Sequence, residues 1–485
     1  MNSLKRANEF VRLNKHPKKK ERPQIHVAPE IGWMNDPNGF SVYQGDIHLF
    51  YQYHPYSDQW GPMYWGHVKS KDMITWENLP VALAPDSGAD EAGCFSGTAV
   101  AYDDQHVLMY TAVSGDLKEP ETLFQNQSIA IGDGEKYKKV FADPVITGEM
   151  LPEGCSRQDF RDPKIWKEGD SFLAIVANLD SDERGQILLF ESKDLIDWKY
   201  VKILAKNDGR YGRMWECPDF FSIEGISFLI VSPQDMPARG YEFHPGNNAV
   251  YFPGDWNKEE WEFTYDEATS LDYGLDFYAP QTTQLEDGRR VLIAWMQSWD
   301  GNIKPAKQDW NGMMTIPREL LVINGRLIQQ PIRELEKYHT NHQERLGHTI
   351  QGRVSVDSIS GRCMDLTLDL LEGDFESLKI SFACDEVHHT DFIFHKSNGI
   401  IEYDRTFSGV VRDVGNSRKM KVNPRDGGVK LRFILDYYSI ELFVNDGEQC
   451  FSAAYYTPLE ADAIWFDCDG EVKMDIKKDD FFIDR

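Results

Sequence analysis

A seven-residue segment that occurs twice constrains the fold of this chain more than any other feature. Residues 70–76 (Ser-Lys-Asp-Met-Ile-Thr-Trp) return as residues 192–198 (Ser-Lys-Asp-Leu-Ile-Asp-Trp), an offset of 122 residues. Self-similarity at a fixed offset is typical of folds built from repeated modules, and an offset of two modules gives about 61 residues for each. Residues 25–330 are then long enough for five modules.

Short β-rich segments separated by turn residues run through the same part of the chain. Examples are residues 47–53 (Ile-His-Leu-Phe-Tyr-Gln-Tyr) and residues 107–111 (Val-Leu-Met-Tyr-Thr), with turn signals such as Asp287-Gly288 between such segments. Many short strands with almost no long helical pattern are typical of an all-β sandwich, barrel or propeller. Together with the repeat, they predict a five-bladed β-propeller with one site motif on each innermost strand.

The two ends of the chain have sequence patterns that differ from that of the propeller. Residues 4–15 predict a short amphipathic helix. Near the C-terminus, apolar and polar residues alternate, and Asp446-Gly447 is a strong hairpin signal between strands. We therefore predict an N-terminal helical extension (1–24), the propeller (25–332), a linker (333–345) and an antiparallel β-sandwich (346–485) with a structural or interface role.

Charge and cysteine content narrow the class of protein. The net charge is −27, which argues against nucleic acid or an anionic membrane as a partner. Seven scattered cysteines with no C-x-x-C pair argue against a disulfide framework or a structural zinc site. No secretory leader or membrane-spanning run is recognisable, so we expect a cytoplasmic protein. The oligomeric state does not follow from the sequence.

Three acidic residues followed within two positions by proline carry the chemistry. They are Asp36, Asp162 and Glu216, separated by 126 and 54 residues. Equivalent positions on the innermost strands of a propeller face a shared centre, so these side chains are predicted to meet there. A cluster of carboxylates at such a centre is typical of glycosidases, in which one carboxylate is the nucleophile or base and another carboxyl is the acid.

Each motif taken alone also has a purely structural explanation. Asp36 lies in an Asn-Asp-Pro-Asn-Gly sequence that favours a tight turn. Arg161-Asp162 is compatible with a surface ion pair, and Glu216 with an exposed carboxylate before proline. The flanking Trp215 and Cys217 instead place Glu216 in apolar company, which suits a general acid. Aromatic residues that could wall the site, although most tryptophans in a propeller pack between blades, are Trp33, Trp60, Trp65, Phe95, Tyr278, Trp295 and Trp299.

Several motifs that occur in order resemble those of glycoside hydrolase family 32, the family of invertases, sucrose-6-phosphate hydrolases, inulinases and levanases. They are residues 33–39 (Trp-Met-Asn-Asp-Pro-Asn-Gly), Gln52, residues 65–70 (Trp-Gly-His-Val-Lys-Ser), 95–97 (Phe-Ser-Gly), 161–163 (Arg-Asp-Pro), 216–218 (Glu-Cys-Pro) and 277–279 (Phe-Tyr-Ala). The resemblance extends from about His26 to the segment 445–448, which is nearly the whole chain.

The resemblance implies a five-bladed propeller with a C-terminal β-sandwich and a retaining β-fructofuranosidase that acts on a small sugar without a metal or organic cofactor. It implies Asp36 as the nucleophile, Glu216 as the acid/base and Asp162 as the stabiliser of the transition state. The residues that it places at the fructosyl subsite are Asn35, Gln52, Trp60, Phe95, Ser96, Arg161 and Trp295.

The leaving group stays open at this point. Sucrose, sucrose 6-phosphate and short fructo-oligosaccharides share the terminal β-fructofuranosyl unit. A phosphate requires a basic group near the leaving sugar, and the candidates are Arg157, Lys164, Arg210, Arg213 and Arg239. Two alternatives also remain, namely a fructosyltransferase that uses the same covalent intermediate and a non-catalytic sugar-binding propeller.

Overall fold

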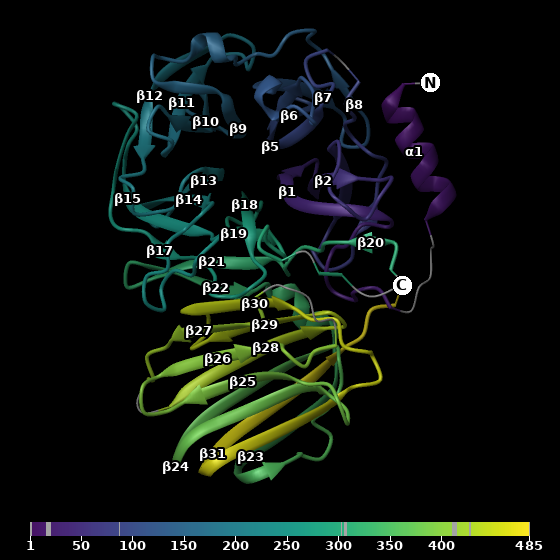
Figure 1. Cartoon of the computed structure of the whole chain (residues 1–485), viewed down its shortest axis with the longest axis vertical. Helices are drawn as coiled ribbons and strands as arrows, with labels where there is room; N and C mark the ends of the chain where they lie inside the picture. Colours follow the sequence, from purple (N-terminus) through teal and green to yellow (C-terminus); the bar gives the residue numbers. More distant parts are fainter. Residues whose placement is uncertain are drawn as a thin grey trace.

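The computed structural model describes residues 2–15, 21–86, 88–301, 303–304, 308–409, 415–425 and 428–484. Figure 1 shows a ring of five small sheets in the upper part of the molecule and a β-sandwich below it. The predicted fold, a five-bladed β-propeller followed by a β-sandwich, is therefore confirmed. No helix in the described part of the chain is long and apolar enough to cross a membrane.

Each blade is an antiparallel sheet whose strands follow one another in sequence. Blade 1 contains β1 (Gly32–Tyr43), β2 (Asp46–His54), β3 (Tyr64–Ser70) and β4 (Glu77–Asn78). Blade 2 contains β5 (Gly93–Tyr102), β6 (Gln105–Ser114), β7 (Phe124–Gly132) and β8 (Tyr137–Lys139). Blade 3 contains β9 (Cys155–Glu168), β10 (Ser171–Asp180), β11 (Gly185–Ser192) and β12 (Trp198–Lys206).

The remaining two blades complete the ring. Blade 4 contains β13 (Trp215–Ile223), β14 (Ile226–Pro233), β15 (Val250–Asn257), β16 (Glu262–Tyr265) and β17 (Thr269–Ser270). Blade 5 contains β18 (Tyr278–Gln284), β19 (Arg290–Trp295), β21 (Arg318–Ile323) and β22 (Arg326–Pro331). The short β20 (Trp310–Asn311) leaves blade 5 and pairs in parallel with β1, which joins the last blade to the first. Two short 3-10 helices, Pro120–Thr122 and Gly148–Met150, lie in the loops of blades 2 and 3.

The repeated segment forms the same turn in blades 1 and 3. In both copies the serine hydroxyl accepts hydrogen bonds from the backbone N–H groups of the third and fourth residues, and the indole of the seventh donates to the fourth carbonyl. The fourth residue, Met73 or Leu195, has a φ of 63° or 67°. The turns join β3 to β4 and β11 to β12, two blades apart, so the interpretation of the offset as two modules is confirmed.

The first strands of the five blades contact one another in a closed ring, and the register of each is interrupted by a bulge. The interruptions lie between Met34 and Pro37, Phe95 and Gly97, Arg161 and Lys164, Glu216 and Asp219, and Tyr278 and Gln281. In blades 3, 4 and 5 the residue before the proline, Asp162, Cys217 or Ala279, has a φ of 63°, 48° or 52°. A bulge re-aims side chains locally, so each inner strand points its motif towards the shared centre.

The sandwich is a nine-stranded antiparallel assembly around its own apolar core. Its strands are β23 (His339–Val354), β24 (Met364–Cys384), β25 (Thr390–His395), β26 (Ile400–Asp404), β27 (Ser417–Lys421), β28 (Val429–Asp436), β29 (Ser439–Val444), β30 (Gln449–Ala454) and β31 (Ala463–Phe481). The connector is a 3-10 helix over Arg333–Tyr338, so β23 begins inside the predicted linker. Because β23 is an edge strand that pairs only with β31 and starts with exposed polar residues, its pattern lacks the usual alternation.

The N-terminal helix α1 (Ser3–Asn14) packs against blade 1, close to the predicted range 4–15 (Figure 1). Ala7 is fully buried, and the ring of Phe10 lies 4.9 Å from that of Tyr56. The side-chain amide of Asn8 donates to the backbone carbonyl of Val81, and its oxygen accepts from the backbone N–H of Val81. The segment 16–20 of the predicted N-terminal extension lies outside the described residues.

A fully buried network of charged side chains joins the propeller to the sandwich. Arg318 of β21 pairs with Asp272 and with Glu441 of β29. His26 contacts both Asp436, at 2.9 Å, and Glu441, at 3.0 Å. Burial by itself lowers the pKa of His26, but its hydrogen bonds to these two carboxylates raise it to about 9. The stability of the contact between propeller and sandwich therefore depends on the protonation of one histidine, His26.

Candidate active site

A cavity of about 280 Å³ opens where the bulged inner strands meet. The residues that line it come from all three acidic motifs and from the adjoining loops: Asn35, Asp36, Gln52, Trp60, Met63, Phe95, Ser96, Gln125, Asp159, Arg161, Asp162, Glu216, Gln234 and Trp299. The structure thus brings together the three carboxyls that lie up to 180 residues apart in the sequence. The volume is close to the lower end of small-molecule sites.

Asp36 lines this cavity from β1 and is buried. Its Oδ2 accepts a hydrogen bond of 2.7 Å from the Ser96 hydroxyl, and its Oδ1 accepts one of 3.2 Å from the Asn35 amide. The Asn35 oxygen in turn accepts from the indole of Trp33, which fixes the amide. Burial raises the pKa of Asp36 to about 6, and the charge of Glu216 acts in the same direction. Asp36 is therefore a carboxylate at neutral pH, with one oxygen held on each side.

Asp162 and Asp36 are linked by the thiol of Cys217. The sulfur lies 3.5 Å from Asp36 Oδ2 and 3.6 Å from Asp162 Oδ2. The backbone N–H of Cys217 also donates to Asp162 Oδ2. Burial raises the pKa of Asp162, against the opposing charge of Arg161, which lies 4.0 Å away. The two aspartates thus lie together in one buried cluster, and the charge of Asp36 adds to the rise in the pKa of Asp162.

Glu216 is held by three polar side chains. Its Oε1 accepts from Arg161 at 3.0 Å, and its Oε2 accepts from Tyr278 at 2.7 Å and from Gln234 at 2.9 Å. The prediction that the Glu216 carboxyl has apolar surroundings, which was based on its neighbour Trp215, is therefore wrong. Neighbouring side chains of a strand point to opposite faces, so the Trp215 indole packs into the blade core instead.

Most residues predicted at the fructosyl subsite line the cavity, but Trp295 does not. Trp295 is fully buried and packs behind the wall, with its ring 6.0 Å from Trp33 and 5.0 Å from Trp299. Trp299, four residues later, reaches the cavity and is 39% exposed. In this structure Trp295 supports the aromatic wall, and its contact with a sugar stays a prediction.

Four lining residues had no part in the predicted site, namely Met63, Gln125, Asp159 and Gln234. Asp159 lies two residues before Arg161 on β9, so it shares a face with that arginine. The two-residue spacing of side chains on one face of a strand could therefore have indicated Asp159 from the sequence. Gln125 and Gln234 come from β7 and from the segment after β14, where no sequence signal marks them.

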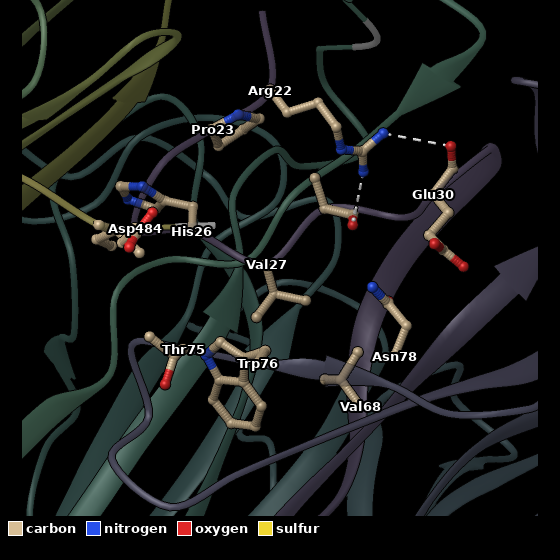
Figure 2. Close-up of a pocket in the computed structure, with 12 residues that line it drawn as sticks. Arg22, Pro23, His26, Val27, Glu30, Val68, Thr75, Trp76, Asn78 and Asp484 are labelled. Atoms are coloured by element: carbon tan, nitrogen blue, oxygen red, sulfur yellow. Dashed lines mark hydrogen bonds between the residues drawn. The ribbon is translucent and has the colours of Figure 1, made fainter. Parts of the chain in front are cut away.

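A larger cavity of about 420 Å³ lies at the junction of the N-terminal segment, blade 1 and the C-terminus (Figure 2). Arg22 in its wall donates to the backbone carbonyls of residues 28 and 30, and His26 is occupied by the network at the sandwich. Arg22 and His26, two charged residues in the wall of this cavity, therefore hold the junction together. No group of His, Cys, Asp and Glu in the described residues is placed to hold a metal ion.

Comparison with known proteins gives the same family at every level. The profile described as "Glycosyl hydrolases family 32 N-terminal domain" matches residues 26–331, and that described as "Glycosyl hydrolases family 32 C terminal" matches residues 332–479. The chain is 36% identical to a sucrose-6-phosphate hydrolase of Escherichia coli, over 90% of each protein. It is 35% identical to a raffinose invertase of Escherichia coli, again over 90% of each.

Solved structures agree with these relatives. A GH32 β-fructofuranosidase of Bombyx mori superposes with a TM-score of 0.83 at 31% identity, covering 99% of this chain and 97% of the other. A mutant of the same enzyme was solved in complex with sucrose. A sucrose-6-phosphate hydrolase of Lactobacillus gasseri gives a TM-score of 0.85 at 26% identity, with 99% and 96% covered.

Proposed function

This chain belongs to glycoside hydrolase family 32, and we propose that it hydrolyses the terminal β-fructofuranosyl residue of sucrose, sucrose 6-phosphate or short fructo-oligosaccharides. The observation that carries the proposal is the convergence of Asp36, Asp162 and Glu216 on one cavity of about 280 Å³. The names of the relatives support the substrate class. The cytoplasmic location and the oligomeric state stay predictions.

In this proposal Asp36 is the nucleophile. It attacks the anomeric carbon of the fructosyl unit, and the bond to the leaving sugar breaks as a covalent fructosyl-enzyme forms. Its pKa of about 6 leaves it ionised at neutral pH. The hydrogen bonds from Ser96 and Asn35 orient its two oxygens before substrate arrives.

Glu216 is the acid/base in this proposal. It gives its proton to the leaving oxygen in the first step and takes a proton from the attacking water in the second. The hydrogen bonds of its carboxyl to Arg161, Gln234 and Tyr278 fix its position during both steps.

Asp162 has the third role. In this proposal its carboxylate, which lies next to Asp36 through the Cys217 thiol, accepts hydrogen bonds from fructosyl hydroxyls. It also adds negative charge where the oxocarbenium-like transition state becomes positive. Retention of the anomeric configuration follows from the two displacements.

Incubation with sucrose tests the proposal. Equal amounts of glucose and fructose are expected, and the Asp36→Asn variant should release neither at a comparable rate. Asp469→Asn, an equal change of charge on an exposed position of β31, is the matched control. Oligofructosides with little free fructose would indicate the transferase instead. If the wild-type protein left sucrose, sucrose 6-phosphate and kestose all intact, the proposal would be contradicted.

A further inference from the structure

The mouth of the cavity offers a leaving sugar aromatic and amide groups. Trp60 and Trp299 are 41% and 39% exposed, a large apolar area for residues of this kind. Gln125 and Gln234 also line the cavity, where the Gln234 amide donates to Glu216 and the Gln125 oxygen accepts from Arg161. Aromatic faces with a few polar groups are typical of sites for uncharged ligands with an apolar face and hydroxyls.

The charged groups of the wall are almost all negative. Asp36, Asp159, Asp162 and Glu216 line the cavity, and Arg161 is the one cationic side chain among the described residues that do. Arg161 is already engaged, since it contacts Glu216 at 3.0 Å and Asp159 at 3.2 Å. Its NH1 also donates to Gln125. A phosphate would have to break these contacts to gain a cation.

The basic residues that the sequence offered for a phosphate are placed elsewhere and are paired with carboxylates. The pairs are Arg157 with Glu149, Lys164 with Asp219, Arg210 with Asp208 and Glu267, Arg213 with Glu183, and Arg239 with Glu267. None of these cations is among the described residues that line the cavity. Lys304, in the loop after Trp299, is also paired, with Asp58.

Asp159 lies on the side where the leaving group departs. One guanidinium, that of Arg161, bridges Asp159 and Glu216. Glu216 protonates the oxygen of the leaving sugar, so that sugar lies beside Glu216 and towards the mouth. The carboxylate of Asp159 is 37% exposed there. A phosphate on the leaving sugar therefore meets two carboxylates that share a single cation, rather than a basic pocket.

We infer that this site selects an uncharged leaving group, so that sucrose is a better substrate than sucrose 6-phosphate, with Asp159 as a specificity-determining residue. This inference rests on the proposed function. The net charge of −27 acts in the same direction, because it repels a dianionic substrate during approach.

Side-by-side kinetics of the wild-type protein test the inference. We expect kcat/KM for sucrose to exceed that for sucrose 6-phosphate at least ~10-fold at low salt, the size of one like-charge repulsion near a protein surface. Raising NaCl from ~20 mM to ~0.5 M should lower the ratio of kcat/KM for sucrose to that for sucrose 6-phosphate. The added salt shortens the Debye length several-fold and so weakens the repulsion. The rate with sucrose should change little.

Variants assign the effect to Asp159. Asp159→Asn is expected to lower the ratio of kcat/KM for sucrose to that for sucrose 6-phosphate by about threefold or more, because it removes one charge next to the leaving group. Asp469→Asn removes one charge from the sandwich and should leave the ratio as it is. Preference for sucrose 6-phosphate, with hydrolysis of both sugars intact, would overturn the inference and leave the proposed function standing. Hydrolysis of neither sugar would overturn both. An unchanged ratio in Asp159→Asn would remove Asp159 from the role.

Discussion

Replacing Ser96 by alanine is expected to move the acid limb of the pH–rate profile to higher pH. Asp36 must be ionised to attack, so kcat/KM for sucrose falls as the pH drops through the pKa of Asp36, about 6. The Ser96 hydroxyl donates to Asp36 at 2.7 Å and stabilises the ionised form. Its loss therefore raises the pKa further.

The size of the shift follows from the strength of that hydrogen bond. A hydrogen bond to a charged group contributes about 1.5–3 kcal/mol, and 1.36 kcal/mol corresponds to one pKa unit. The lower end applies here because Asn35 and Cys217 keep their contacts with Asp36. We expect the midpoint of the acid limb to rise by ~1 unit.

Initial rates with sucrose between pH ~4 and ~8 measure this midpoint. Ser222→Ala, which removes a hydroxyl that bonds to Ser227 in the β13–β14 hairpin, is the control and should leave the midpoint unchanged. Ser96 donates to Asp36 and, among the hydrogen bonds of the described residues, has none to Asp162. A shift of the midpoint therefore assigns the acid limb of the profile to Asp36 rather than to Asp162. A midpoint that stays in place, or that moves to lower pH, would refute this assignment of the nucleophile.

Further predictions concern the other charged groups. Asp36→Asn should lower kcat for sucrose by several orders of magnitude with unchanged circular dichroism; near wild-type turnover would exclude Asp36 as the nucleophile. Glu216→Gln should slow sucrose by ~10²–10⁴-fold but an aryl fructoside with an activated leaving group far less, because only sucrose needs the proton; equal losses would make Glu216 a binding residue. His26 has a pKa of about 9 in the fold against an ordinary 6.5, so its contribution of ~3 kcal/mol is present below pH ~6.5 and is lost as the pH rises through ~9. Urea unfolding at pH 7 and pH 10 should show that loss in the wild type and a smaller one in His26→Gln.

The fold and the three carboxyls could be predicted because they leave periodic signals. The repeated turn at residues 70–76 and 192–198 depends on local hydrogen bonds between its own side chains and backbone, so its sequence identifies it wherever it occurs. The motif before each proline marks a bulge whose geometry is also local. The repeat and these motifs together then predict which residues meet at the centre.

The mouth of the cavity could not be predicted in the same way. Gln234 reaches it from a segment beyond the end of β14, where length and direction depend on tertiary packing. Trp299, beyond the end of β19, was predicted only as one of seven aromatic candidates for the wall. The surroundings of Glu216 were misjudged for a related reason. Sequence neighbours such as Trp215 were taken as spatial neighbours, whereas the partners of the carboxyl, Arg161 and Tyr278, come from the adjacent blades.

The bulges explain how one blade positions the chemistry of the next. At each positive-φ residue the ladder is interrupted, and the freed N–H needs another acceptor. Asp162 N–H donates to the Thr111 hydroxyl of blade 2, Cys217 N–H to Asp162 of blade 3, and Ala279 N–H to a serine hydroxyl of blade 4. Each acceptor belongs to the preceding blade. The same backbone distortion that aims a side chain into the cavity therefore also ties it to its neighbour around the ring. Asp162 takes part twice, as the proposed stabiliser of the transition state and as the acceptor for the freed N–H that follows Glu216. This hydrogen bond therefore links the position of the stabiliser to that of the acid/base, in addition to the side chains that hold Glu216.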